Sequence, residues 1–227
     1  MIVAIAGFIM TVVFYALAKR LYRLKKHMLL TPLLVTPIAL AALLIVSGIS
    51  FDAYNEGAHW LSDMLQPATI AFAIPLSRHF DLIKKHAVQI LVSVLTGSVI
   101  AVVSSLALAK ALQLNEQLLN SLLPHSATTP IAIGVSESIG GIPTLTAVAV
   151  VATGLFGSII GPSVIRLLKI RNDIAKGVLL GTSAHGAGTS KAFEFSGVSG
   201  TVSSISMILA AITTFLITPW ILETFHF

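Results

Sequence analysis

The sequence predicts an all-α protein that crosses a membrane several times. Of its 227 residues, 56% are hydrophobic and only 10% are charged, against about 25% charged in an ordinary soluble domain. So few charges cannot cover a soluble globular surface, and such high hydrophobicity also excludes a disordered chain. The absence of cysteine excludes disulfides, thiol catalysis and cysteine-based metal sites. We expect one transmembrane domain, residues 1–227.

The uncharged stretches predict about eight membrane segments. A membrane helix needs about 20 apolar residues, and six stretches approach or exceed that length: residues 1–18, 27–51, 86–109, 117–136, 138–165 and 195–222. Two shorter stretches complete the set: residues 64–77, which contain Pro67 and Pro75, and residues 177–190, which contain four glycines. No basic residue precedes the first apolar run, so we interpret residues 1–18 as a membrane anchor and not a signal peptide.

Basic residues predict which loops face the cytoplasm. Lys and Arg gather in three clusters, within residues 19–26, 78–85 and 166–176. Cytoplasmic loops carry an excess of positive charge, and the acidic segment 52–63 between the first two clusters has no basic residue. We therefore expect a multi-pass protein of the bacterial cytoplasmic (inner) membrane with its N-terminus outside. The net charge of +5 does not indicate nucleic-acid binding, because long apolar runs separate the clusters.

The third basic cluster predicts a re-entrant element. If residues 117–136 and 143–165 both crossed the membrane, this cluster would lie outside, against the positive-inside rule. The conflict disappears if residues 124–141 enter the membrane and return to the same side. Non-helical backbone at membrane depth needs surrounding protein or a water-filled cavity. With the glycine-rich stretch 177–190, the chain has two broken or re-entrant elements, as a transport site or a pore would need.

Three ionisable residues, Glu137, His185 and Lys191, stand out because a charge at membrane depth costs about 2.5–3.5 kcal/mol on insertion scales. Glu137 and His185 are candidate proton carriers. Glu137 either serves as a proton or cation site or as a gate residue, or lies at the membrane interface, where it caps a helix or pairs with Lys. His185 lies among small residues, which suit either a tight helix contact or a loop whose N–H groups hold an anion. Lys191 either pairs with Glu194 or attracts an anion toward this loop.

The segment Thr128-Thr129-Pro130 is a third polar feature. Proline removes an N–H group and disfavours helix at the preceding residue, so hydroxyls and freed main-chain groups could bind a ligand. The alternative is a proline kink satisfied by neighbouring hydroxyls. The sequence Thr36-Pro-Ile-Ala-Leu40 resembles Thr129-Pro-Ile-Ala-Ile133, which predicts an internal repeat of residues 29–110 and 124–200, inverted as in many transporters.

The remaining motifs are less informative. We expect Asn55, Glu56 and His59 to lie in an external loop, with Trp60 as an interface anchor. The hydrolase pattern Gly-x-Ser-x-Gly and the zinc pattern His-Glu-x-x-His are both absent. We therefore expect a protein that is not an enzyme and uses no metal or cofactor.

Taken in order along the chain, these motifs resemble the LrgB/CidB family of bacterial membrane proteins. The matching pieces are Tyr54-Asn-Glu-Gly57, Pro67-Ala-Thr-Ile-Ala-Phe-Ala-Ile-Pro75, Ser126-Ala-Thr-Thr-Pro-Ile-Ala132, Ser136-Glu137, Gly140-Gly-Ile-Pro143, Gly161-Pro162 and Gly181-Thr-Ser-Ala-His-Gly-Ala-Gly-Thr189. Two small departures are Ala127, where the family pattern has Val, and Ser183, where Ala is commoner.

The resemblance implies two functions. The family was named for antiholin- or holin-like control of murein hydrolases and cell lysis, whereas relatives, including the plastid glycolate/glycerate transporter, move small 2-hydroxy or 2-keto carboxylates. It also implies a small LrgA/CidA-type membrane partner. A re-entrant polar motif favours transport of a monocarboxylate such as pyruvate, glycolate, lactate or glycerate, coupled to an ion or proton through Glu137 or His185. A homo-oligomer is also expected. The candidate substrate-binding residues are Thr128, Thr129, Pro130, Ser136, Gly181, Thr182, His185, Gly186, Gly188, Thr189, Asn55 and Thr69.

Overall fold

The computed structural model describes residues 2–25, 30–64, 67, 70, 71, 77 and 79–224. These residues form helices and connecting turns, which confirms the all-α prediction. The chain divides into two compact units, residues 1–71 and residues 72–227. Thr69, one of the predicted site residues, lies outside the described residues.

The first unit contains α1 (Ile2–Leu24), α2 (Pro32–Ser47) and α3 (Phe51–Asp63). α1 and α3 pack closely. A Cβ on Gly7 would meet the carbonyl of Tyr54, and the Thr11 hydroxyl lies 2.7 Å from the Tyr54 hydroxyl. Ser50 caps α3 by accepting from the N–H of Ala53. The prediction of a loop around Asn55 is therefore wrong, because this segment is a capped helix.

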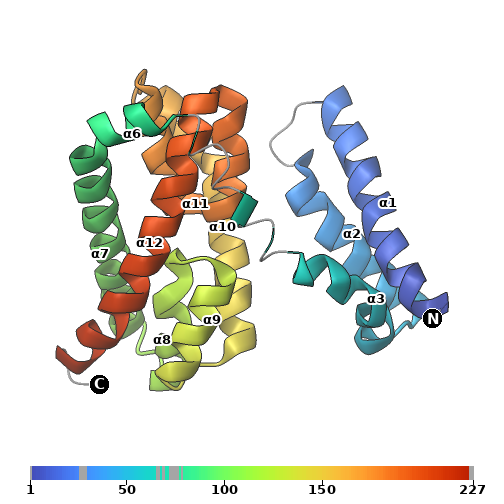
Figure 1. Ribbon diagram of the computed structural model, residues 1–227. Helices are drawn as coiled ribbons and strands as arrows, with labels where there is room; N and C mark the ends of the chain where they lie inside the picture. Colours follow the sequence, from blue (N-terminus) through green and yellow to red (C-terminus); the bar gives the residue numbers. More distant parts are fainter. Residues whose placement is uncertain are drawn as a thin grey trace. The chain divides into compact units, whose positions relative to one another are not determined.

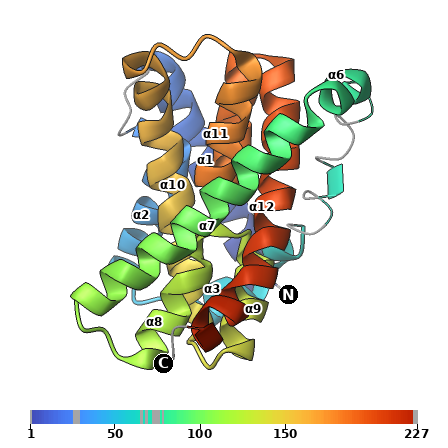
Figure 2. The same ribbon diagram turned by 90° about the vertical axis from the view of Figure 1, so that its left-hand side faces the viewer.

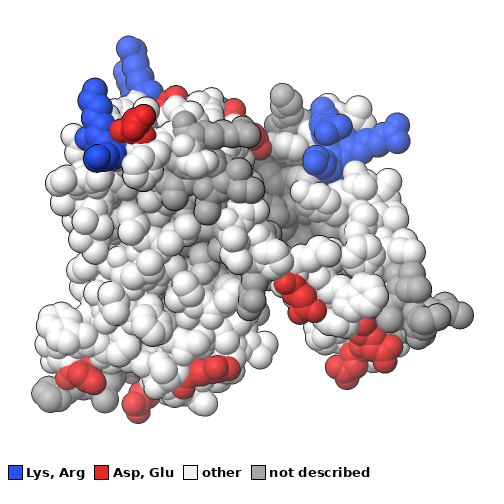
Figure 3. Space-filling model, in the orientation of Figure 1, with Lys and Arg blue, Asp and Glu red and all other residues white. Residues whose placement is uncertain are grey.

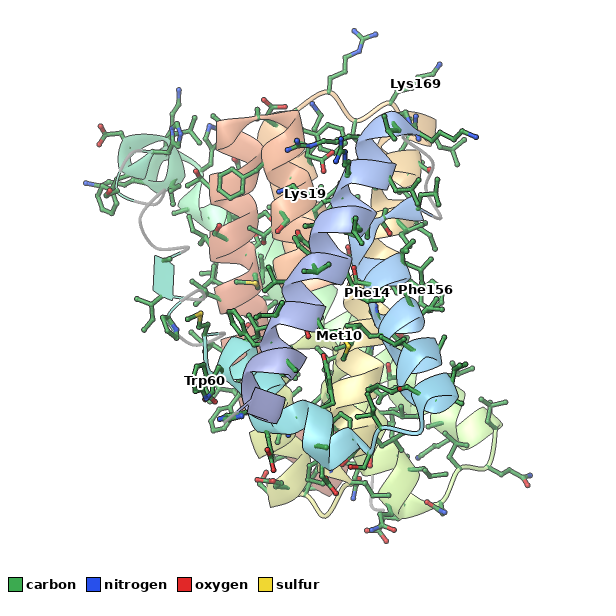
Figure 4. The ribbon with its side chains drawn as sticks, turned by 90° about the vertical axis from the view of Figure 1, so that its right-hand side faces the viewer. Met10, Phe14, Lys19, Trp60, Phe156 and Lys169 are labelled. Atoms are coloured by element: carbon green, nitrogen blue, oxygen red, sulfur yellow. The ribbon has the colours of Figure 1, made fainter. Side chains whose placement is uncertain are left out.

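The first unit carries basic side chains at one end and acidic side chains at the other. Figure 4 shows Met10 and Phe14 along α1, with Lys19 toward one end of that helix and Trp60 on α3 toward the other. Trp60 is 55% exposed, as an interface anchor would be. In Figure 3, basic side chains cover one end of this unit and acidic side chains the other. The charges thus lie as they would if the unit crossed a membrane.

Three helices of the second unit are long and apolar enough to cross a membrane: α7 (Ala87–Ala111), α10 (Pro143–Leu167) and α12 (Gly197–Thr224). At 1.5 Å per residue, each rises about 37 Å or more, which exceeds the 30 Å hydrocarbon core. The short α6 (Phe80–Lys85) precedes α7. These spans confirm a polytopic membrane protein, in which two further elements enter the unit without crossing it.

The first of these elements, here called hairpin A, consists of α8 (Glu116–Leu122), the 3₁₀ turn η2 (Leu123–Ser126) and α9 (Thr129–Ser138). Its two arms close at the base, where the Asn120 side chain donates to the Ile139 carbonyl at 2.6 Å and Ser121 accepts from the Ile142 N–H at 2.7 Å. The chain therefore enters and returns on the same side, as predicted for residues 124–141.

The second element, hairpin B, is α11 (Asp173–Phe195), whose helix breaks at His185. The chain reverses there: a Cβ on Gly188 would meet the carbonyl of Leu180, and Lys176 of one arm lies 5.7 Å from the centre of the Phe195 ring of the other. Figure 2 shows α11 at one end of the unit and α8 and α9 at the other. The broken segment predicted at 177–190 is thus a second hairpin, entering from the opposite end.

The hairpins together span about one bilayer. α9 has ten residues and rises about 15 Å, and the first arm of hairpin B, residues 173–184, rises about 18 Å. Their sum is close to the 30 Å of the hydrocarbon core. With each base at one membrane surface, the tips meet near the midplane, surrounded by α7, α10 and α12 (Figure 1).

Hairpin A with α10 and hairpin B with α12 form two sequence-related halves. Asn115 and Asn172 cap the hairpins alike, each side-chain oxygen accepting from a main-chain N–H at 2.8 Å. Other pairs of identical residues have the same sequence separation as Asn115 and Asn172. They are Leu122 and Leu179, Leu123 and Leu180, Ser126 and Ser183, Ala127 and Ala184, Glu137 and Glu194, Gly140 and Gly197, Thr144 and Thr201, Ile160 and Ile217, Pro162 and Pro219. Because the hairpins start from opposite ends, the halves form an inverted repeat of the kind found in transporters.

The short sequence match between residues 36–40 and 129–133 pairs different segments from those of this inverted repeat. Thr36-Pro37 lies inside the continuous helix α2, whereas Thr129-Pro130 begins α9 after the tip of hairpin A. The wider repeat of residues 29–110 and 124–200 stays a prediction.

Candidate functional site

The candidate site lies where the two hairpin tips meet. At the tip of hairpin A, Ala127 and Thr128 have extended backbone, and Pro130 occupies the first turn of α9, where its missing N–H costs nothing. The tip of hairpin B, at His185, lies against the η2 turn of hairpin A beside Ser126. The structure thus brings His185 against Ser126, and Thr128, Thr129 and Pro130 follow Ser126 closely in sequence at the same tip.

His185 is the most unusual residue of this site. It is 4% exposed, and neither of its ring nitrogens completes a hydrogen bond with any described residue. Its backbone has φ 47° and ψ −128°, a conformation that favours glycine and costs a residue with a side chain about 1–3 kcal/mol. A buried imidazole held by a strained backbone, with unused nitrogens, is suited to bind a ligand or a proton.

The N-termini of α9 and of the second arm of hairpin B also lie at the hairpin tips. The first-turn N–H groups of any helix lack partners within the helix, and the Thr128 side chain makes no capping hydrogen bond to α9. The second arm of hairpin B begins at Gly186, directly after His185. Each N-terminus carries about half a positive charge, so the site as a whole favours an anion.

α12 supplies hydroxyl groups to both tips. Ser126 of hairpin A lies 3.3 Å from the hydroxyl of Thr214, and Thr189 of hairpin B lies 2.9 Å from the hydroxyl of Ser203. Between these two contacts along α12, the buried Ser206 hydroxyl has no hydrogen-bond partner among the described residues. A polar track therefore runs along this otherwise apolar helix beside the tips.

Close backbone approach fixes the position of hairpin B. A Cβ on Gly157 of α10 would lie 2.7 Å from both the Ser183 carbonyl and the Ala184 Cβ. A Cβ on Gly177 would lie 2.6 Å from the Ser199 carbonyl of α12. The small residues of this stretch therefore make a tight helix contact, and the anion-binding loop stays a prediction.

A network of hydroxyl groups ties hairpin A to α10. Thr146, which is fully buried, donates to the Ser121 carbonyl at 2.9 Å and lies 2.7 Å from the Ser136 hydroxyl. Ser136, a predicted substrate-binding residue, is thus held at the base of the hairpin and away from its tip. Thr182 likewise donates its hydroxyl to the Val178 carbonyl of its own arm at 2.7 Å.

The base of hairpin B carries two surface ion pairs. Lys176 lies 2.7 Å from Asp173, and Lys191 lies 2.6 Å from Glu194, as the spacing of the latter pair predicts. The hydrogen bond from Lys176, with others from Ser196 and Ser199, holds the pKa of the Asp173 carboxyl below its usual range. Such exposed pairs contribute at most about 1 kcal/mol to stability.

Of two other predicted residues, Glu137 lies away from the tip of hairpin A and Asn55 belongs to the first unit. Glu137 is exposed near the C-terminal end of α9, the position expected if it belongs to the membrane interface. Asn55 is exposed on α3 of the first unit, where its carbonyl contacts the Nδ1 atom of His59 at 3.0 Å. A role for Glu137 in proton coupling or for Asn55 in substrate binding stays a prediction.

The sequence analysis missed His125 and the α12 hydroxyls. The available signal for α12 was its run of hydroxyl residues between Ser199 and Ser206 within an apolar stretch. His125 carried a weaker signal, because only the hairpin brings it next to His185.

Comparison with known proteins identifies one family and several bacterial relatives. The profile of the LrgB-like family matches residues 11–224. Uncharacterized protein YwbG of Bacillus subtilis (strain 168) is 54% identical over 223 residues, which cover 98% of this chain and 99% of that protein. Antiholin-like protein LrgB of Bacillus cereus (strain B4264) is 36% identical over 214 residues, which cover 94% and 93%. No solved structure matches the chain.

Proposed function

This chain belongs to the LrgB-like family, and we propose that it transports small monocarboxylates across the bacterial cytoplasmic membrane without catalysing a chemical reaction. The observation that carries the proposal is the meeting of two oppositely oriented hairpins at a buried imidazole that has unused nitrogens. Transporters place substrates near the midplane, at broken helices whose N-termini face the anionic group. A simple pore or a regulator has no need of this arrangement.

The carboxylate would bind at the tips. The first-turn N–H groups of α9 and of the second arm of hairpin B would donate to its oxygens, because these N–H groups have no partners within their helices. The Thr128 hydroxyl, which does not cap α9, and the α12 hydroxyls would bind a 2-hydroxy or 2-keto oxygen. The imidazole of His185 would hydrogen-bond the carboxylate or carry the coupled proton.

Orientation and partners complete the proposal. The basic residues Lys84, Lys85, Arg166, Lys169 and Arg171 flank the membrane segments of the second unit. By the positive-inside rule, the loops that carry these residues would face the cytoplasm and the N-terminus would lie outside. A small LrgA/CidA-type membrane protein is the proposed partner, and the chain would also associate with itself.

The second candidate function is antiholin-like control of murein hydrolases and cell lysis. The observation that favours it is the name carried by relatives such as Antiholin-like protein LrgB of Bacillus cereus, and these names support it more directly than they support transport. In this case the hairpins would have no solute to bind, and lysis control would depend on assembly in the membrane.

Uptake by proteoliposomes tests the proposal. Purified protein should take up labelled pyruvate, glycolate or lactate with saturation, and His185→Gln should abolish the uptake. Thr128→Val should raise KM about tenfold, because it removes one hydrogen bond to an anion, about 1.5 kcal/mol. Thr144→Val, at an exposed position of α10, is the matched control and should leave KM unchanged.

If the chain instead controls cell lysis, we expect no saturable uptake in the same proteoliposomes. Leakage of an entrapped dye without saturable carboxylate uptake would contradict transport and support a lysis-related role.

A further inference from the structure

Two buried serine hydroxyls of the spanning helices, on Ser98 of α7 and Ser206 of α12, have no hydrogen-bond partner within the described part of the chain. The two residues are 2% and 0% exposed. A serine inside a helix commonly donates its hydroxyl to the carbonyl one turn earlier, as Ser204 does to Gly200 at 3.0 Å. Buried donors without a partner are uncommon, because their loss of hydration is not compensated. These two hydroxyls are therefore candidates to bind a ligand.

Ser98 lies on α7 at the level where the two hairpins meet. One turn before it, Val94 belongs to a core cluster against which Val178 of hairpin B packs. One turn after it, Val102 belongs to a second cluster, which includes Leu123 of hairpin A. The face of α7 that carries Ser98 thus passes from hairpin B to hairpin A at this serine.

Ser206 occupies the corresponding level of α12, which packs against α7. Four residues before it, Val202 belongs to the cluster against which Val178 of hairpin B packs. Five residues after it, Ala211 belongs to a cluster that includes Ala127 of hairpin A. Both serines therefore lie between the contacts with hairpin B and the contacts with hairpin A.

Ser206 also adjoins the first arm of hairpin B. A Cβ on Gly181 would lie 2.9 Å from the Cβ of Ser206, and His185 follows Gly181 by four residues. The ring nitrogens of His185 likewise lack partners among the residues that the structure describes. Three elements, α7, α12 and hairpin B, thus each bring an unpartnered polar side chain to the level of the tips.

The chemistry of the two hydroxyls indicates what they bind. Each has one proton to donate and lone pairs to accept, and neither is charged. A cation would use only the lone pairs and would leave both protons without an acceptor. An anionic carboxylate is suited to the helix N-termini at the tips. The ligand group that suits the serines is therefore a neutral oxygen, which accepts a hydrogen bond as a keto group or accepts and donates as a hydroxyl.

We propose that Ser98 and Ser206 select the solute by binding the oxygen on the carbon next to the carboxylate. The inference rests on the proposed transport function, and it assigns the choice among monocarboxylates to two hydroxyls on different helices. A keto oxygen accepts from both serines, and a hydroxyl accepts from one and donates to the other. Propionate, which has no such oxygen, leaves both protons without an acceptor, and a site built for a hydrogen bond discriminates strongly against an analogue that lacks it.

The selectivity of the wild-type protein is the first test. Uptake by proteoliposomes gives kcat/KM for labelled pyruvate, lactate and propionate, which all have three carbons and one negative charge. Each unpaired hydroxyl should lower kcat/KM about tenfold, so pyruvate and lactate should exceed propionate by about 100-fold. Equal values for pyruvate and propionate would overturn the inference and leave carboxylate transport intact.

Two alanine variants assign the selectivity to the serines. Ser98→Ala and Ser206→Ala should each reduce the preference for pyruvate over propionate about tenfold, and the double variant should take up the two solutes about equally. Damage to the fold would lower the uptake of both solutes alike and leave their ratio unchanged. Ser158→Ala is the matched control, because this buried serine of α10 donates its hydroxyl to the Leu155 carbonyl at 2.8 Å. It should keep the wild-type ratio.

Thermal unfolding of wild-type protein in detergent measures selection without transport or substitution. A ligand that binds the folded state raises the unfolding midpoint, so pyruvate should raise it more than propionate does at the same concentration. Equal shifts would contradict selection at the site.

The outcomes separate this inference from the proposed function. A wild-type ratio in both single variants would refute the role of Ser98 and Ser206 and leave transport intact. Absence of saturable uptake of all three solutes by wild-type protein would refute both.

Discussion

At the scale of single residues, His185 combines a buried imidazole with a backbone that a glycine would adopt more easily. Its neighbours Gly186 and Gly188 could have hosted the break at no steric cost, yet the chain places the break at a histidine. Strain of this kind persists where surrounding structure imposes it, often at functional sites. The position of His185 at the hairpin tip fits this pattern.

This strain predicts an inverted order of stability for two substitutions. In an ordinary helix, glycine is about 1 kcal/mol less stable than alanine. At φ 47° alanine is strained and glycine is not, so His185→Gly should be about 1 kcal/mol more stable than His185→Ala. Thermal or denaturant unfolding in detergent measures the difference.

The control for this pair is two residues away. Ser183 is exposed and lies on the regular helix before the break, so there the alanine variant should be more stable than the glycine variant. The same order at both positions would contradict the strained backbone at His185.

At the scale of elements, hairpin B is held by small residues and hairpin A by hydroxyl groups. Gly157 and Gly177 let the first arm of hairpin B approach the backbones of α10 and α12. Hairpin A instead uses Thr146, Ser121 and Ser136. Hairpin B also has a hydroxyl contact with α12, between Thr189 and Ser203, so its close backbone packing acts together with a directional bond.

Gly157→Ala should therefore destabilise the protein. The added Cβ would lie 2.7 Å from the Ser183 carbonyl, and such overpacking typically costs about 1–3 kcal/mol. Gly97→Ala is the matched control, because it also lies within a spanning helix but its Cβ would meet no atom within 4 Å. It should be neutral or stabilise by up to about 1 kcal/mol. Unfolding in detergent compares the two, and equal effects would argue against the close contact.

At the scale of the whole molecule, the inverted halves make both ends of the second unit similar in construction. Each end holds the base of one hairpin, and each half adds one spanning helix with a proline near its C-terminal end, Pro162 in α10 and Pro219 in α12. A site between such halves can be reached from either side by equivalent movements, as alternating access requires.

The hairpin topology predicts a labelling pattern. Single cysteines can be introduced without background, since the chain has none. Glu116→Cys and Ser138→Cys flank hairpin A and should react with an impermeant maleimide from the same side of the membrane. Arg171→Cys and Gly197→Cys flank hairpin B and should both react from the opposite side. Labelling of Glu116→Cys and Ser138→Cys from different sides would mean that this segment crosses the membrane.

Charge and composition predicted much of this fold. The distribution of basic residues required residues 124–141 to return to their own side, and hairpin A does so. The glycine content of 177–190 indicated a break, but composition cannot distinguish a kink from a full reversal, which depends on contacts such as that of Gly188 with Leu180.

The depth of a residue in the membrane was harder to predict than the side of the membrane on which a loop lies. Glu137 interrupts an apolar run and was expected near the site, yet it is exposed toward the base of hairpin A, because a hairpin carries only its tip inward. His125 reaches the tip for the same reason, and no local pattern marked it. The relation between the halves also escaped the sequence analysis, because their identical residues are scattered among apolar positions.

The equal reach of the two hairpins has an electrical consequence. A charge bound where the tips meet has passed through about half of the transmembrane field, about 1.2 kcal/mol per 100 mV, whichever side it came from. The membrane voltage therefore biases entry of an ion from one face by as much as it opposes entry from the other, and the electrical distance from the site to either aqueous phase is the same.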